Sequence, residues 1–244
     1  VQRPAFDHDV IPTTWREVGV GAAGRLGTGG LNYKVYLMNG LVAEEFSGIE
    51  GIRGGRQGGH EATFANPSLT GRLEWARSGL RLGGSFWYGG TAAQDPALGE
   101  ETFDVPVAVI AADARYNRGP FTARAIIARV SISDADQINT AFGTDAGSEI
   151  LGGYVEGAYD LLAFLAPRSN QNLAAFVRHE RFDTHHEVPT GIARNEAFDR
   201  QITTAGLTYK PVYNVAFKAD YQWRRNHAGS GEDEVMALGM GFSF

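Results

Sequence analysis

The feature that most constrains the fold is an alternation of apolar and polar residues that runs along almost the whole chain. Segments of eight to twelve residues place an apolar or aromatic side chain at every second position, and Gly, Pro, Asn or Asp residues bound each segment. The clearest apolar sets are Leu31, Tyr33, Val35 and Leu37, and Val215, Phe217, Ala219, Tyr221 and Trp223. Because successive side chains of a strand point to opposite faces, this period of two predicts β-strands with one apolar face.

Eleven such segments can be delimited, and the spacing typical of helices is weak throughout. They span residues 13–27, 31–41, 68–77, 80–90, 105–117, 121–132, 150–164, 171–182, 201–210, 213–225 and 234–244. The stretch around Leu161, Leu162 and Phe164 is the least strand-like part of this set. The sequence therefore predicts an all-β chain.

The links between these segments alternate strictly between short and long. Short links fall at residues 27–30, 76–79, 117–120, 165–171 and 211–212, and long links fall at 42–67, 91–104, 133–149, 183–200 and 226–233. Such alternation is typical of an antiparallel up-and-down barrel with tight turns on one rim and long loops on the other. A soluble sandwich with Greek-key crossings would not produce it.

Composition excludes several classes of protein. The 244 residues include no cysteine, which removes disulfide scaffolds, Cys-ligated metal sites and thiol nucleophiles. A net charge of −6 argues against nucleic acid as a partner. No window holds the roughly 18 consecutive apolar residues that a spanning helix needs. We expect no cofactor and no metal.

Charges and aromatic residues occupy opposite faces of the expected strands. Mid-strand charges on the polar faces are Glu17, Arg25, Lys34, Arg72, Glu74, Arg81, Asp113, Arg115, Arg124, Glu156, Asp160, Arg178, Glu180, Lys210, Lys218 and Asp220. Aromatic residues near the ends of the apolar faces are Tyr33, Trp75, Tyr88, Tyr116, Tyr159, Tyr209, Tyr221 and Trp223. This division predicts a transmembrane barrel with a polar lumen and aromatic girdles. The alternative is a soluble lipocalin-like barrel, for which eleven strands are too many.

The last segment ends in an aromatic residue, Phe244, on the same face as Leu238, Met240 and Phe242. It resembles the carboxy-terminal signal of bacterial outer-membrane barrels. If Phe244 lies at the periplasmic rim, every long link is extracellular and every short link is periplasmic. Eleven strands that start outside are an odd number, so we expect residues 1–244 to be a single barrel domain lacking at least one upstream strand. The competing explanation is an error of one strand within residues 150–182.

Three runs of sequence resemble bacterial porins of the phosphate-selective porin O and P type and their uncharacterised relatives. They are Arg3-Pro4 with residues 11–20 (IPTTWREVGV), residues 31–41 (LNYKVYLMNGL), and residues 71–75 (GRLEW) with 79–83 (GLRLG). The resemblance covers nearly the whole chain as a pattern and is most specific over residues 3–90. It implies a passive diffusion channel in the outer membrane of a Gram-negative bacterium, with about 16 strands in full, a loop folded into the lumen and a homotrimeric state. The ladder of basic side chains that gives the family its selectivity cannot be matched position by position.

The alternation also yields candidates for the lining of the pore. These are Arg25, Lys34, Arg72, Glu74, Arg81, Asp113, Arg115, Arg124, Glu156, Arg178, Glu180, Lys210, Lys218 and Asp220. Basic residues outnumber acidic ones on the polar faces, so we expect a pore that mildly favours anions. The excess acid is expected in the long loops, at Glu44, Glu45, Glu50, Asp95, Glu100, Glu101, Asp134, Asp136, Asp145, Glu149, Glu232, Asp233 and Glu234.

The longest loop holds two further candidates, Arg53 and Arg56, among the glycines of residues 52–59. Glycine allows the backbone to fold sharply inward, and rings of Arg or Lys favour anions, so these arginines are candidates for a constriction. The alternative is an external cap whose arginines face the phosphates of lipopolysaccharide. The expected partners are therefore outer-membrane lipids, lipopolysaccharide and small solutes or anions in transit.

Two other kinds of barrel compete with a channel. One is an outer-membrane hydrolase with a site between His179 and His186, where Asp183 and His185 also lie. Adjacent His185 and His186 point to opposite faces of an extended chain, so we favour a coincidental cluster and expect no enzyme activity. The other is a structural or adhesive barrel whose lumen is closed by side chains, which the near balance of lumen charges permits.

Overall fold

Eleven strands form one antiparallel sheet in strict chain order, as the sequence predicts. The computed structural model describes residues 3–12, 14–59, 62–64, 66–93, 103–231 and 233–243. The strands of the sheet are β1 (Gly19–Leu26), β2 (Leu31–Asn39), β3 (Pro67–Arg77), β4 (Leu80–Gly89), β7 (Val107–Arg118), β8 (Phe121–Ile132), β9 (Glu149–Asp160), β10 (Asn172–Glu187), β11 (Asp199–Val212), β12 (Val215–Asn226) and β13 (Asp233–Phe242). Each strand pairs with its neighbours in sequence, which is the up-and-down topology of a barrel wall.

Short elements occupy the amino-terminal segment and the links. They are α1 (Phe6–Asp9), η1 (Ala43–Glu45), the pair β5 (Ala92–Ala93) and β6 (Phe103–Asp104), α2 (Ala135–Phe142), α3 (Leu162–Leu165) and η2 (Glu196–Phe198). Among the described residues, no helix is long and apolar enough to cross a membrane.

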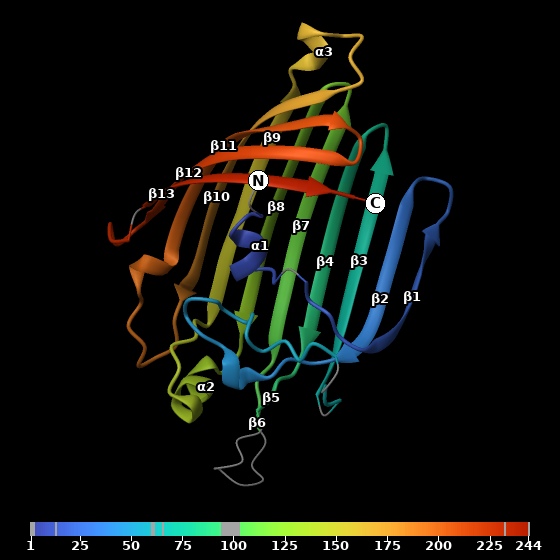
Figure 1. Cartoon of the computed structure of the whole chain (residues 1–244). Helices are drawn as coiled ribbons and strands as arrows, with labels where there is room; N and C mark the ends of the chain where they lie inside the picture. Colours follow the sequence, from blue (N-terminus) through green and yellow to red (C-terminus); the bar gives the residue numbers. More distant parts are fainter. Residues whose placement is uncertain are drawn as a thin grey trace.

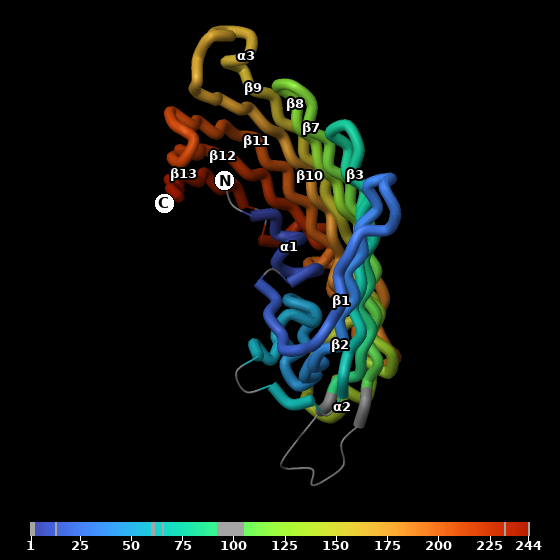
Figure 2. Tube along the Cα trace, turned by 90° about the vertical axis from the view of Figure 1, so that its right-hand side faces the viewer, coloured from blue at the N-terminus to red at the C-terminus, as the bar shows by residue number. Residues whose placement is uncertain are grey.

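The sheet is strongly curved, so it has a convex and a concave face (Figure 1). The amino-terminal segment with α1 and the loop between β2 and β3 lie on the concave side (Figure 2). Within the described residues, β1 and β13 each pair on one side only and form the two edges of the sheet. The wall is therefore curved like part of a barrel and is open between these edges.

The links divide between the two ends of the sheet as the alternation predicts. The turns after β1, β3, β7 and β11 lie at one end, whereas α2 and the β5–β6 pair lie at the other (Figure 1). The tight turns depend on glycines with positive φ, such as Gly79 at φ +84° and Gly119 at φ +56°. We refer below to the tight-turn end and the long-loop end.

Several expected segment ends are wrong. The segment expected at 150–164 stops at Asp160, whose side chain accepts hydrogen bonds from the N–H groups of Leu162 and Leu173, and α3 follows from Leu162. The segment expected from residue 13 starts at Gly19, and the one expected at 171–182 continues to Glu187. The expectation for Phe244 lies outside the described residues. Helix α2 was not expected, because two turns are too short for a clear periodic signal.

The expected distribution of acids in the loops is also wrong in part. Glu149, Asp233 and Glu234 belong to strands rather than to long links. Glu17 precedes β1, where it accepts hydrogen bonds from Trp15 and Asn39 instead of facing the lumen from a strand. Asp95, Glu100, Glu101 and Glu232 lie outside the described residues.

The hydrophobic core lies between the concave face and the segments that fold onto it at the long-loop end. Phe6, Val10, Leu41, Phe46 and Ile52 of these segments are buried. Against them pack buried side chains of the wall, which include Trp87, Val107, Val109, Val130 and Ile150. The concave side is therefore filled by a packed core at this end, while charged side chains line it toward the other.

Replacing Gly79 with Ala should destabilise the fold more than replacing Gly119. A Cβ at Gly79 would lie 2.2 Å from the carbonyl oxygen of Asn117, whereas a Cβ at Gly119 meets nothing within 4 Å. Both residues have positive φ, so G119A should cost about 1 kcal/mol from backbone strain alone. We expect G79A to cost about 2 kcal/mol or more. Urea unfolding monitored by tryptophan fluorescence measures both, and equal losses would contradict the proposed clash.

Candidate functional site

The strand register places all fourteen lining candidates on the concave face. Directly paired residues of an antiparallel sheet share a face, and the concave face is identified by Glu180, which contacts α1. Successive neighbours along one line across the sheet are Arg81, Arg115, Arg124, Glu156 and Arg178. We call the four arginines of this line the basic row. Arg25, Lys34, Arg72, Glu74, Asp113, Glu180, Lys210, Lys218 and Asp220 lie on the same face.

Ion pairs bind most of the acids of this wall to arginines. Both nitrogens of one edge of the Arg124 guanidinium donate to Glu156, each at 2.9 Å. Arg178 donates to Glu180 at 2.8 Å, and both side chains are almost completely buried. Further pairs join Arg72 to Asp113 and Glu74, and Arg81 to Glu74. These acids are therefore neutralised locally.

Several basic side chains of the concave wall take no part in these ion pairs. Arg25, Lys34, Arg115, Lys210 and Lys218 form no salt bridge with any described residue. Three of them, Arg115, Lys210 and Lys218, line a cavity of about 440 Å³ together with the Arg124–Glu156 pair. The described part of the concave wall thus carries a surplus of positive charge toward the tight-turn end.

Two segments narrow the concave side at the long-loop end. The N–H of Phe6 donates to Glu180 at 3.1 Å, and the Phe6 ring lies edge-on to Tyr154. Arg200 donates to Asp9 at 2.9 Å and to the carbonyl oxygen of Ile49 at 2.8 Å, so it holds residues 3–12 and the β2–β3 loop to the wall together.

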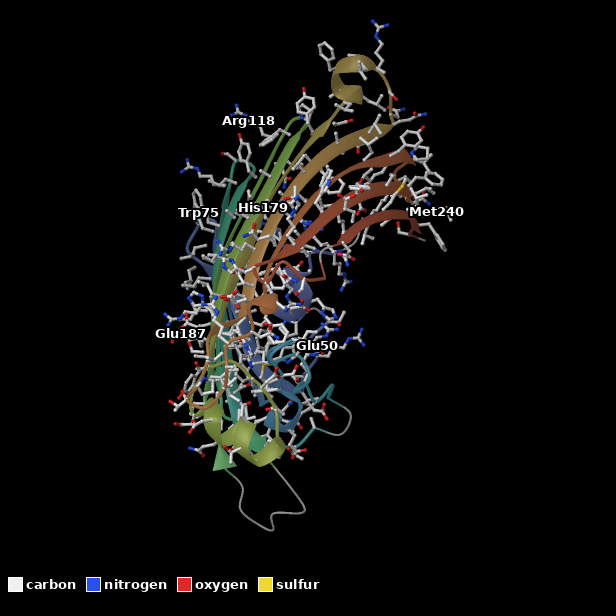
Figure 3. All side chains as sticks on the ribbon, turned by 90° about the vertical axis from the view of Figure 1, so that its left-hand side faces the viewer. Glu50, Trp75, Arg118, His179, Glu187 and Met240 are labelled. Atoms are coloured by element: carbon white, nitrogen blue, oxygen red, sulfur yellow. The ribbon has the colours of Figure 1, made fainter. Side chains whose placement is uncertain are left out.

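Arg53 and Arg56 lie in this inward-folded loop. Arg53 donates to the carbonyl oxygen of His8 at 3.2 Å, and Arg56 donates to the carbonyl oxygen of Arg53 at 2.8 Å. Burial and then the charge of Arg53 lower the pKa of Arg56. The loop stands on the concave side, where Glu50 is labelled in Figure 3 opposite Trp75 and Arg118 on the convex side. Both arginines are half-buried between the loop and its surroundings.

Asp7 of α1 is an acid that the sequence did not single out. Burial raises its pKa above the usual value, against the attraction of Arg124, Arg178, Arg3 and Arg115. The carboxyl group of Asp7 is thus within electrostatic reach of three members of the basic row. Residues 1–12 were expected at the end of an external loop, so Asp7, Asp9 and Arg200 were missed. The apolar pair Phe6 and Val10, four residues apart, was the signal that this segment packs against something.

A second cavity, of about 590 Å³, separates the amino-terminal segment from strands β10 to β13. Arg3, His8 and Asp9 line one side of it, and Arg200, Gln222 and Arg224 line the other. The concave side therefore keeps space beside α1 as well as toward the tight turns.

The histidine cluster does not form one site. His179 is on the convex face and hydrogen-bonds with Thr203 at 3.0 Å. His185 is buried, with its Nε2 2.6 Å from the carbonyl oxygen of Asp145 and its ring edge-on to Phe198. His186 approaches Glu149 at 3.8 Å. Among the described residues, no group of three or more His, Asp or Glu side chains is arranged to hold a metal ion.

Comparison with known proteins finds a likeness in fold to a porin. No protein-family model matches it. An uncharacterised protein of Aquifex aeolicus is 30% identical over 234 residues, which cover 91% of this chain and 51% of that protein. The chain thus spans about half the length of the curated relative it matches. An anion-selective porin from Comamonas acidovorans has a TM-score of 0.50 at 11% identity, covering 90% of this chain and 57% of the porin. OccK5 (OpdH) of Pseudomonas aeruginosa has a TM-score of 0.44 at 10% identity over 93% of this chain and 72% of its own. At these identities, the likeness to the Comamonas porin concerns the fold, which is the porin type of antiparallel β-barrel wall.

Replacing Asp7 with Asn should stabilise the protein at neutral pH. Because its pKa is raised in the folded state, Asp7 favours folding fully only below its unfolded value of 3.8 and loses that contribution as pH rises through the folded value. The neutral Asn side chain avoids the cost of burying a charge. We expect D7N to have the higher melting temperature at pH 7 and the difference to shrink toward pH 3. A D7N variant less stable than wild type at pH 7 would mean that attraction by the arginines outweighs burial.

Proposed function

We propose that this chain is part of an outer-membrane channel for passive diffusion of small hydrophilic solutes, with a mild preference for anions. The observation that carries the proposal is the cluster of Arg115, Lys210 and Lys218 around the 440 Å³ cavity of the concave wall, since none of the three forms a salt bridge with a described residue. Basic side chains lining a pore lower the barrier for anions. Most acids of the wall weaken this positive potential only slightly, because arginines pair with Glu74, Asp113, Glu156 and Glu180.

The convex face supports a location in a membrane. On β8 the outward residues from Phe121 to Ile127 are uncharged, and the first outward charge is Arg129, about 27 Å farther along the strand than Phe121. With the tilt usual for such barrels, this length corresponds to an apolar band about 20 Å tall, near the expected 25 Å. All eight aromatic residues expected at girdles are on this face, among them Trp75, Tyr159 and Trp223.

The two sheet edges support a larger barrel. A strand edge exposed to lipid would leave backbone N–H and C=O groups without partners, and spanning barrels avoid this by closure. We propose that strands beyond β1 close the wall, so that residues 1–244 form one part of a single barrel domain of about 16 strands. The length of the Aquifex relative, about twice the part that aligns, agrees with this proposal.

The same proposal includes a relationship to the phosphate-selective porin O and P type, which the sequence runs quoted above support. It also includes assembly as a homotrimer and contact with outer-membrane lipids and lipopolysaccharide. Small anions are the proposed solutes, since the likeness in fold is to a porin whose name describes it as anion-selective. We propose no enzyme activity, because His179 lies on the opposite face of the wall from buried His185.

A plugged structural barrel is the second candidate. It is favoured by the packing of residues 3–12 and the β2–β3 loop, which bury Phe6, Phe46 and Ile52 against the concave face. The cavities of about 590 and 440 Å³ favour an open path instead. Single-channel recording separates the two, because a plugged barrel shows no unitary conductance.

Neutralising the unpaired cations should reduce anion preference. In planar bilayers under a KCl gradient, we expect the full-length protein to show a reversal potential that indicates mild anion selectivity. The triple variant R115Q/K210Q/K218Q should shift it toward cations, because three positive charges leave the cavity wall. R118Q is the matched control, since Arg118 is exposed on the convex face at the tight-turn end. Strong cation preference in the wild type would overturn the anion assignment.

A charge placed in the middle of the convex face should destabilise the protein in a bilayer. Val155 is outward-facing, 57% exposed and four residues from Tyr159. V155R should cost about 2–4 kcal/mol if this face contacts lipid. A158R is the control, because Ala158 lines the concave cavity on the same strand. Unfolding from lipid vesicles measures both variants, and a V155R variant as stable as wild type would mean that the convex face is in water.

A further inference from the structure

A group of charged side chains stands on the convex face at the long-loop end, outside any channel lining. It consists of Arg129 of β8, Arg181 of β10 and Arg194 of the link after β10, with Glu149, Asp183 and Asp199 beside them. We call these six residues the rim cluster. The register places Arg129 and Asp183 on one line across the convex face and Arg181 on the next line.

The rim cluster is layered, with acids inside and arginines outside. Arg181 donates to both oxygens of Asp199, at 3.3 and 3.0 Å, and Arg194 donates to Asp183 at 2.7 Å. Arg129 pairs with Glu149 in the same way. The side chains of the three acids are only 7–9% exposed, whereas the arginines are 47–61% exposed.

This layering determines what the surface offers to a ligand. A guanidinium group carries five N–H donors in one plane, and a carboxylate partner uses at most two of them. The remaining donors of Arg129, Arg181 and Arg194 therefore face outward. Because the arginines cover most of each acid, the outward polar groups of the cluster are mainly guanidinium donors. His186, which faces Glu149 at 3.8 Å, adds a fourth nitrogen-bearing side chain at the border.

A groove adjoins the rim cluster on the side of the apolar band. Its volume is about 540 Å³, and it is lined by Arg181, Arg194 and their partners Asp199 and Asp183, together with the apolar residues Ile127 and Leu151. Gly153 adds no side chain to the groove, and a Cβ at this position would clash with the carbonyl oxygen of Ile126. The groove thus combines an apolar floor with a border of arginines that are each paired with a less exposed acid.

We infer that the rim cluster and its groove bind a phosphorylated lipid of the outer leaflet, with phosphate on the arginines and an acyl chain on the apolar floor. This inference rests on the proposed function, which places the convex face in the outer membrane with the long loops outside. The cluster stands where the outward residues change from apolar to charged, which is the depth of lipid headgroups. Arginine is also the side chain best suited to bind phosphate through paired hydrogen bonds.

The test measures binding of bis-phosphorylated lipid A to the full-length protein in phosphatidylcholine nanodiscs, by native mass spectrometry. The variant is R181Q/D199N/R194Q/D183N, which removes two exposed arginines together with their covered acids and so leaves no buried charge unpaired. We expect its affinity to be at least about tenfold lower, since each lost phosphate contact is a charge-assisted hydrogen bond. R118Q, with an outward arginine at the opposite rim, should bind as wild type does.

Three results would overturn the inference. They are equal affinity of wild type and variant, equal affinity of wild type for lipid A and its dephosphorylated form, or a change of oligomeric state in the variant without a change in lipid binding. The last would identify the groove as an interface between copies. Single R129Q, whose partner Glu149 lies at the loop border, provides a second variant if the quadruple one does not fold. Conductance of the same preparations is recorded separately. A protein that binds lipid A but does not conduct would refute the proposed channel function and leave the lipid-binding inference standing.

Discussion

The cross-strand register is the constraint on which the rest of this structure depends. In the part of the chain that the structure describes, ten successive antiparallel pairings join the strands of the wall and leave two edges. Because paired residues share a face, the same register sorts every side chain into a convex set and a concave set. A shift of one residue in any pairing would exchange the two sets on that strand. Apolar residues such as Ile110 and Val177 would then lie on the concave face, and Arg124 or Arg178 would lie on the convex face. If the convex face contacts lipid, as proposed, this exchange would cost several kcal/mol per charge.

Charge on the concave wall is organised by proximity rather than by composition. The chain has a net charge of −6, yet the wall around Arg115, Lys210 and Lys218 is positive, because Glu156 is bound to Arg124 and Glu180 to Arg178. Arginine–acid pairs also occur on the convex face at the long-loop end, where the arginine is the exposed partner. There Asp183 and Asp199 are covered by exposed arginines. On both faces, an acid fixes the position of a guanidinium group, and the arginine is the main source of the charge at the surface.

The inward segments make the two ends of the concave face differ, with an apolar core at one end and a charged cavity toward the other. Residues 3–12 and the β2–β3 loop pack a hydrophobic core onto the concave face at the long-loop end, where Phe6, Phe46 and Ile52 are buried. Toward the tight turns no such core forms among the described residues, and charged side chains line the cavity. Arg200 joins the two segments to the wall through Asp9 and Ile49. The narrowest part of the concave side and its charged lining therefore lie at different ends of the wall.

The sequence by itself determined the strands, their order, the asymmetry of their links and the face on which each lining candidate lies. Alternation carries that information locally, since a period of two needs no knowledge of partners. It missed the end of β9, which local hydrogen bonds to Asp160 mark. It also failed where contacts are distant in sequence, as in the inward path of α1 and the roles of Asp7, Asp9 and Arg200. Only the tertiary structure decided most of the charge pairing, because the partners of Arg124 and Arg181, which are Glu156 and Asp199, come from other strands. The rim cluster emerged in the same way, since Arg194 reaches Asp183 only after the link between β10 and β11 has folded back onto the wall.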